Sequence, residues 1–170
     1  GGILDIKISK KEKIKVKKIS ITKKNNKLIK NNFLLIYTNI KRDSSKVILS
    51  QKKRKSSIIK HYDKIKSLNQ PILKSFKNGN AKHIGEMFNY HWRLKKGLSD
   101  KITDKQIDNF YKDLIYKYQI LGGKLIGAGG GGFFLVCVNN KKKICKILDE
   151  DRINYIDFDI EKNGSKVLYS

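Results

Sequence analysis

Residues 121–138 read Leu-Gly-Gly-Lys-Leu-Ile-Gly-Ala-Gly-Gly-Gly-Gly-Phe-Phe-Leu-Val-Cys-Val, and this stretch decides the fold. The apolar segments on either side of the glycines are β-branched or aromatic, which predicts two short buried strands. Glycine is costly to order, so the run from Gly127 to Gly132 indicates a bend with positive φ, or a backbone against which a ligand or another loop presses. Successive N–H groups in such a bend can converge on a phosphate.

Two common phosphate-binding motifs are excluded by the residues on the C-terminal side of the glycines. Residues 127–132 match G-x-G-x-x-G, but that fingerprint must open a helix, and 133–138 is a strand sequence. No Gly-Lys-Ser or Gly-Lys-Thr ends the run, which excludes a Walker loop. The pattern is therefore strand, glycine loop, strand, and on the residues alone it fits either a phosphate-contacting loop or a flexible hairpin without a ligand.

The size and apolar content of the chain indicate one ordinary domain. It has 170 residues, of which 39% are hydrophobic, and no apolar run is long enough to span a membrane. The two cysteines, Cys137 and Cys145, are too few for a disulfide framework. Both are predicted to be reduced thiols in a cytoplasmic protein without a membrane partner.

The charge is strongly basic, with 39 Lys and Arg against 15 Asp and Glu, a net +24. Such a balance first suggests nucleic acid as a partner. The excess is mostly lysine spread along the whole chain, and no helix-turn-helix, zinc-ligand or RNA-binding motif accompanies it. A basic nucleic-acid-binding module stays an alternative, while the main interpretation includes no specific nucleic acid.

Around the glycine stretch, hydrophobic periodicity predicts a mixture of strands and helices. The expected strands are 3–8, 14–21, 33–38 and 155–160, with Asn163-Gly164 turning the last into a partner at 166–169. The expected helices are 45–77 with a break near Pro71, 80–98, one from Thr103 to Gly122-Gly123, and 141–150, while the Lys-rich link 23–27 is expected to be a solvated turn.

Few side chains offer chemistry of their own. His91 and Trp92 lie in a helical stripe and are interpreted as packed residues, whereas Lys95 and Lys96 are expected at the surface. Asp104, Asp108 and Asp113 fit the solvated face of a helix. No His, Cys and Asp set has metal-ligand spacing, so no metal site is predicted, and no Ser, His and Asp triad can be argued, so the catalytic residues stay unassigned.

Residues 122–133, Gly-Gly-Lys-Leu-Ile-Gly-Ala-Gly-Gly-Gly-Gly-Phe, resemble the third signature motif of the GHMP kinases. The form is most similar to the sugar 1-kinase branch, in particular the D-glycero-D-manno-heptose 7-phosphate kinases. The segment 35–45 resembles the strand–turn–helix entry of the same enzymes, and its two cations Lys41 and Arg42 suit a phosphorylated sugar.

The resemblance implies an α+β fold, an antiparallel sheet with helices packed on one face, as in the GHMP kinase C-terminal domain. It assigns 1–32 to the end of the N-terminal kinase domain with connecting strands, and 33–170 to the C-terminal domain. It makes Gly127, Ala128, Gly129, Gly130, Gly131 and Gly132 the phosphate-loop residues, with Lys41 and Arg42 as substrate contacts.

The implied reaction transfers the γ-phosphoryl group of ATP to the anomeric hydroxyl of a phosphorylated heptose. ATP and Mg²⁺ would be bound mainly by the N-terminal half of such an enzyme, which also carries the catalytic Asp. The chain therefore resembles a C-terminal half that is inactive alone and has the N-terminal kinase domain as its partner. A non-catalytic assembly domain with the same fold is the second alternative.

Overall fold

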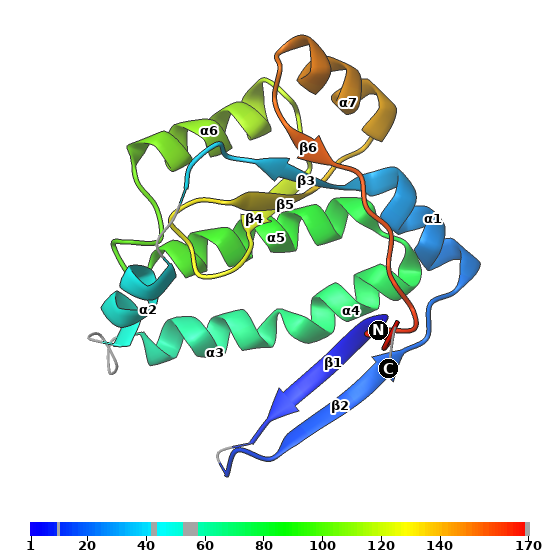
Figure 1. Cartoon of the computed structure of the whole chain (residues 1–170), viewed down its shortest axis with the longest axis vertical. Coiled ribbons are helices and arrows are strands. Elements are labelled where there is room, and N and C mark those ends of the chain that lie inside the picture. The colour runs from blue at the N-terminus through cyan, green and yellow to red at the C-terminus, as the bar shows by residue number, and fades with distance from the viewer. Residues whose placement is uncertain (10, 42–43, 53–57, 169–170) are drawn as a thin grey trace.

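The computed structural model describes residues 1–9, 11–41, 44–52 and 58–168 (Figure 1). Its strands are β1 (Ile3–Ile8), β2 (Ile14–Ile19), β3 (Phe33–Tyr37), β4 (Gly122–Leu125), β5 (Phe133–Cys137) and β6 (Tyr155–Ile156). Its helices are α1 (Lys23–Asn32), α2 (Ser44–Lys52), α3 (Ile59–Ser67), α4 (Asn69–Asn78), α5 (Ala81–Lys96), α6 (Lys105–Tyr116) and α7 (Lys141–Glu150).

The main sheet has the strand order β4-β5-β3-β6, and every pairing in it is antiparallel. Its central pair is β3 with β5, in a register that sets Leu35 opposite Leu135. The strands on either side of the glycine loop, β4 and β5, also pair with each other, so the loop lies at one end of the sheet.

Side chains alternate between the two faces of this sheet. Leu34 and Phe134 face one cluster of buried residues with α6 and α7, whereas Phe33 and Cys137 face another with α1, α4 and α5. In Figure 1, α6 and α7 lie above the sheet and α5 and α4 below it. The predicted α+β class with an antiparallel sheet is confirmed, but the expectation of helices on one face is wrong, because helices cover both faces of the sheet.

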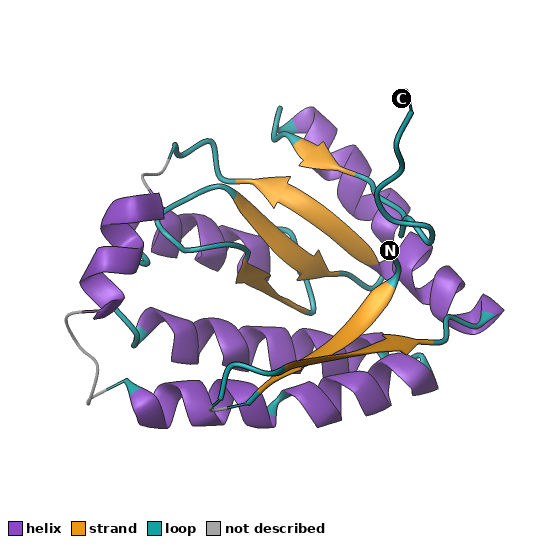
Figure 2. Ribbon diagram, turned by 60° about the horizontal axis from the view of Figure 1, so that its bottom comes forward, coloured by secondary structure: helices purple, strands orange, loops and turns teal. Residues whose placement is uncertain are grey.

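Strands β1 and β2 form a separate antiparallel hairpin (Figure 2). Its inner residues Ile3 and Ile19 reach the cluster around Phe33 and Phe76, which joins the hairpin to α4 and the main sheet. The predicted strands at 3–8 and 14–21 are confirmed, the second ending at Ile19.

The link 23–27, expected to be a turn, is instead the start of α1. Thr22 caps this helix in a reciprocal hydrogen-bonded pair with Asn25, and the Asn25 side chain also donates to the Phe76 carbonyl at 2.8 Å. Leu28 and Ile29 are buried on one face of the helix. The lysine-rich sequence hides the amphipathic pattern of this short helix. Its buried face is stabilised by tertiary contacts.

The C-terminal strand is shorter than expected, because β6 covers only Tyr155–Ile156. Gly164 has a positive φ of 79°, yet no described residue between 157 and 168 is in a strand. This segment runs back to the start of the chain instead, where the Gly2 N–H donates to the Glu161 carbonyl at 2.6 Å. The expected hairpin is wrong as far as residue 168, and the end of its return strand lies outside the described residues.

Both ends of α6 differ from the prediction. The N-cap is Asp104, which accepts from the Ile107 N–H at 2.9 Å, while the Thr103 hydroxyl donates to Asp108. Gly122 does not end the helix but opens β4. Its φ is +152°, and a Cβ there would lie 2.0 Å from the Gly85 carbonyl oxygen. This glycine therefore allows α5 and β4 to touch backbone to backbone.

The helix predicted at 45–77 is instead three helices, α2, α3 and α4, whereas those predicted at 80–98 and 141–150 correspond to α5 and α7. The break predicted near Pro71 lies between α3 and α4, and Pro71 is in the first turn of α4.

Cys137 and Cys145 are both free thiols. In the described part of the chain, no helix combines the length and the apolar character needed to cross a bilayer.

Candidate functional site

The glycine loop is clamped between two segments that are distant in the sequence. The Gly130 N–H donates to the Ile102 carbonyl at 2.8 Å, and the Gly132 N–H donates to the Ile40 carbonyl at 3.2 Å. The Gly132 carbonyl accepts from the N–H and the hydroxyl of Thr38, at 2.8 and 2.9 Å. These two glycine N–H groups therefore brace the loop against protein and do not converge on a ligand.

Close packing explains two of the glycines. Gly131 has a φ of +133°, and a Cβ there would lie 2.4 Å from the Ile40 carbonyl oxygen. Gly129 has a φ of +118°, and its Cβ would lie 3.0 Å from the Ile102 Cα. The sequence left open whether a ligand or another loop packs against the glycine backbone. At these two positions it is another segment of the chain that does so.

A buried lysine fixes the other side of the loop. Lys95 of α5 is 8% exposed, and its Nζ donates to the carbonyls of Leu125 at 2.8 Å and Gly127 at 2.6 Å. The expectation that Lys95 lies at the surface is wrong, because the ammonium is held by backbone oxygens at the start of the loop. Lys96 is about one-third exposed and pairs with Asp108 at 3.1 Å.

A pocket of about 460 Å³ opens beside this anchor. Its polar lining includes Gln51, Tyr62, His91, Lys95 and Lys124, and its loop side is formed by Leu125 to Ala128. Gln51 donates to the Ala128 carbonyl at 3.4 Å. Cationic side chains and a glycine backbone thus share one concave surface.

His91 is the titratable group most altered by this setting. Burial, and then the positive charges of Lys124 and Lys95, lower the pKa of His91 to about 4. Its Nδ1 is buried and has no hydrogen-bond partner among the described residues. The imidazole is therefore neutral near pH 7, and the local positive charge comes from the lysines.

This lowered pKa predicts a pH-dependent stability. Between about 6.5, the ordinary His value, and about 4, the unfolded chain binds a proton that the folded chain does not, so stability falls as pH is lowered through this window. After a reduction for partial solvent exposure, we expect a loss of about 1–2 kcal/mol between pH 7 and 4.5. Urea unfolding of the wild type and of His91→Gln measures it. An equal pH dependence in both proteins would contradict the assignment.

Among the residues predicted for the site, Lys41 is exposed and directly follows Ile40, whose carbonyl accepts from the loop. The structure thus brings residues 39–41, here called the Lys41 turn, and the glycine loop to the same end of the sheet. Arg42 lies outside the described residues. Asp104 and Asp108 are an N-cap and an ion-pair partner. No group of three or more His, Cys, Asp or Glu side chains that could hold a metal occurs in the described ranges.

Sequence reasoning missed Lys95 and Lys124 as members of this surface. The only available signal was their position, Lys95 one turn after His91 in α5 and Lys124 shortly before the loop. Trp92, interpreted as a packing residue, is confirmed as one. It is 1% exposed and its ring meets Phe134 edge-on, with 5.3 Å between the ring centroids.

The model of the family "GHMP kinases C terminal" matches residues 72–154, which run from α4 past the end of α7 and include the glycine loop. This segment therefore has the sequence pattern of a GHMP kinase C-terminal domain. The match confirms the family predicted from the glycine stretch.

The proteins that resemble this chain include kinases of phosphorylated heptose and of mevalonate. The chain is 28% identical over 138 residues to D-glycero-α-D-manno-heptose 7-phosphate kinase of Campylobacter jejuni, covering 78% of this chain and 40% of the relative. It also resembles mevalonate kinase of Methanococcus jannaschii, with 26% identity, a TM-score of 0.58, and coverage of 84% of this chain and 43% of that one.

The fold is shared with a D-glycero-D-manno-heptose 1-phosphate kinase of Bacteroides thetaiotaomicron. The TM-score is 0.65 at 14% identity, with 94% of this chain and 42% of that chain covered. The chain thus spans less than half the length of the relatives it matches.

Proposed function

We propose that this chain provides the C-terminal domain of an ATP-dependent sugar kinase whose acceptor is the anomeric hydroxyl of D-glycero-D-manno-heptose 7-phosphate. The observation that carries the proposal is the bond from the Gly132 N–H to the Ile40 carbonyl, which joins the glycine loop to the Lys41 turn. The identity to a heptose 7-phosphate kinase favours the sugar over mevalonate as the acceptor.

In the proposed reaction the anomeric oxygen attacks the γ-phosphorus, the bond from phosphorus to the ADP oxygen breaks, and the hydroxyl proton is lost. Such a reaction depends on positioning and on charge stabilisation. The loop from Gly127 through Ala128, Gly129, Gly130 and Gly131 to Gly132 would shape one wall of the phosphate site. Because the loop is clamped, this wall is fixed before ligands arrive.

Lys41 and Arg42 would contact the phosphate of the sugar, Lys41 as an exposed cation beside the loop. We propose residues 1–32 as the join to the N-terminal kinase domain and 33–170 as the C-terminal domain. ATP and Mg²⁺ would be held mainly by the N-terminal kinase domain, so this chain would contribute the loop wall and the sugar-phosphate contacts.

A chimera tests the proposal directly. In it, this chain replaces the matching segment of the C. jejuni relative, and ³¹P NMR follows transfer from ATP to heptose 7-phosphate, to the unphosphorylated heptose and to mevalonate. We expect an anomeric phosphate on heptose 7-phosphate, and no turnover by the 170 residues alone. A folded chimera that prefers mevalonate, or turnover by the chain alone, would contradict the proposal.

Within the chimera, Lys41→Ala should raise the KM for heptose 7-phosphate about tenfold, because a charge-assisted contact to its phosphate is lost. The KM for the unphosphorylated heptose should stay unchanged. Lys112→Ala, which removes an exposed lysine from α6, is the matched control. Equal effects of Lys41→Ala on both sugars would remove Lys41 from the substrate site.

A further inference from the structure

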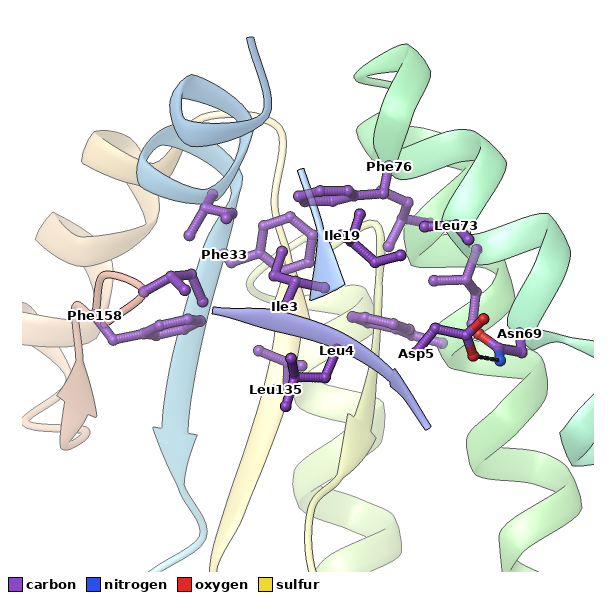
Figure 3. A pocket seen from close by; sticks show the side chains of 15 residues that line it. Ile3, Leu4, Asp5, Ile19, Phe33, Asn69, Leu73, Phe76, Leu135 and Phe158 are labelled. Carbon is purple, nitrogen blue, oxygen red and sulfur yellow. Dashed lines mark hydrogen bonds between the residues drawn. The ribbon is translucent and has the colours of Figure 1, made fainter. Parts of the chain in front are cut away.

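A cavity beneath the β1–β2 hairpin shares no lining residue with the pocket beside the glycine loop. Its volume is about 280 Å³. Figure 3 shows its walls, formed by Ile3 and Ile19 of the hairpin, Leu73 and Phe76 of α4, and Phe33 of β3. Nothing in the proposed phosphoryl transfer uses this space.

The walls are almost wholly aliphatic and aromatic. Rings come from α4, α5, β3 and the C-terminal segment, in Phe76, Phe88, Phe33 and Phe158. A dry cavity of roughly 150 Å³ lined by such residues is large enough to bind benzene. The cavity under the hairpin can therefore hold an apolar group of at least that size.

One charged group lies at the end of this apolar space. Asp5 of β1 is 9% exposed, and it accepts a single hydrogen bond in the described part of the chain, from the Asn69 amide at 3.0 Å. Figure 3 shows this pair at one edge of the cavity. Lys17 lies opposite Asp5 in the hairpin register, but no ion pair joins these two described residues.

A buried carboxylate is costly unless a cation or several hydrogen bonds compensate it. Asn69 supplies one donor, which leaves most of the acceptor capacity of Asp5 unused. A ligand whose apolar part fills the cavity could bring the missing donors. An anionic ligand would be repelled by the carboxylate of Asp5, and a hydrocarbon would leave its negative charge without a donor or a cation.

We propose that the cavity beneath the hairpin binds a small amphiphile, an apolar chain or ring that carries a protonated amine which donates to Asp5. The site is distinct from the proposed kinase chemistry and goes beyond it. Because the ligand would contact β1, β2 and α4 together, it would also fasten the hairpin to the domain.

The test measures binding to the 170-residue chain itself, by calorimetry and by NMR shifts of the cavity methyl groups. The probes are n-hexylammonium, 1-hexanol and hexanoate, which share one chain length and differ in the head group. We expect hexylammonium to bind at least tenfold more tightly than hexanol, since the alcohol can donate one hydrogen bond to Asp5 but carries no positive charge and no further donors. Hexanoate should bind most weakly, and each methylene from butyl- to hexylammonium should tighten binding about fourfold.

Three variants complete the experiment. Asp5→Asn should reduce the preference for the amine over the alcohol to within about threefold. Glu12→Gln removes an exposed carboxylate from the same hairpin and should leave the preference intact. Leu73→Trp should fill the cavity and weaken all three probes. Circular dichroism and thermal unfolding check that each variant is folded.

The proposal is overturned if no probe shows saturable binding to the wild-type chain. It is equally overturned if hexanoate matches hexylammonium, or if folded Asp5→Asn keeps the full preference for the amine. The kinase proposal concerns a different set of residues and is tested by phosphoryl transfer, so either proposal can fail without the other.

Discussion

Replacing Gly131 by alanine should destabilise the chain by about 3–5 kcal/mol, the largest effect expected from a change in the loop. The new Cβ would lie 2.4 Å from the Ile40 carbonyl oxygen, in a backbone with a φ of +133°. The Gly132 N–H donates a hydrogen bond to the Ile40 carbonyl, so the loop and the segment after β3 would have to move together. Urea unfolding followed by circular dichroism measures the loss.

Gly127→Ala is the matched control, since Gly127 also has a positive φ, 74°, but is exposed. A left-handed alanine without a clash should cost about 1–2 kcal/mol. If Gly131→Ala is no worse than Gly127→Ala, the loop is not clamped at Ile40 as described.

Replacing Lys95 by methionine should destabilise the chain by about 2–3 kcal/mol. The methionine keeps most of the side-chain volume, but the carbonyls of Leu125 and Gly127 lose the ammonium that lies 2.8 and 2.6 Å from them. A buried carbonyl oxygen that loses its hydrogen-bond donor destabilises the fold by more than the loss of a hydrogen bond at the surface does. The free energy of unfolding measures this effect, and hydrogen exchange at residues 125–128 should become faster.

Lys96→Met tests whether the effect belongs to the buried position. Lys96 is about one-third exposed and pairs with Asp108, so its loss should cost less than about 1 kcal/mol. Similar losses for the two variants would show that the contacts of Lys95 with the loop carry little energy.

The sequence was sufficient for the features that depend on local pattern. The strands at 33–37 and 133–137 are confirmed because their β-branched and aromatic residues leave few other structures open. The helix at 141–150 is confirmed with the same bounds, its apolar positions Ile144 and Leu148 buried. The glycine motif, together with the segment 35–45, indicated the family.

Features that depend on distant contacts could not be predicted. Lys95 looks like a surface residue in the helical pattern, and its partner carbonyls lie 30 and 32 residues away in the sequence. The helix α1 is held by Leu28, Ile29 and the contact of Asn25 with Phe76, which its lysine-rich sequence does not reveal. The strand predicted at 155–160 is short for the same reason, a distant contact, because Glu161 accepts a hydrogen bond from Gly2 at the start of the chain.

The clamping of the glycine loop by three separate parts of the chain has a consequence for anyone who redesigns this protein. Insertion of even one residue between Gly127 and Gly132 would change the spacing of the backbone groups that bond to Lys95, Ile102 and Ile40. Tags, reporters or grafted segments are therefore better placed at residues 165–168, which are exposed and belong to no strand.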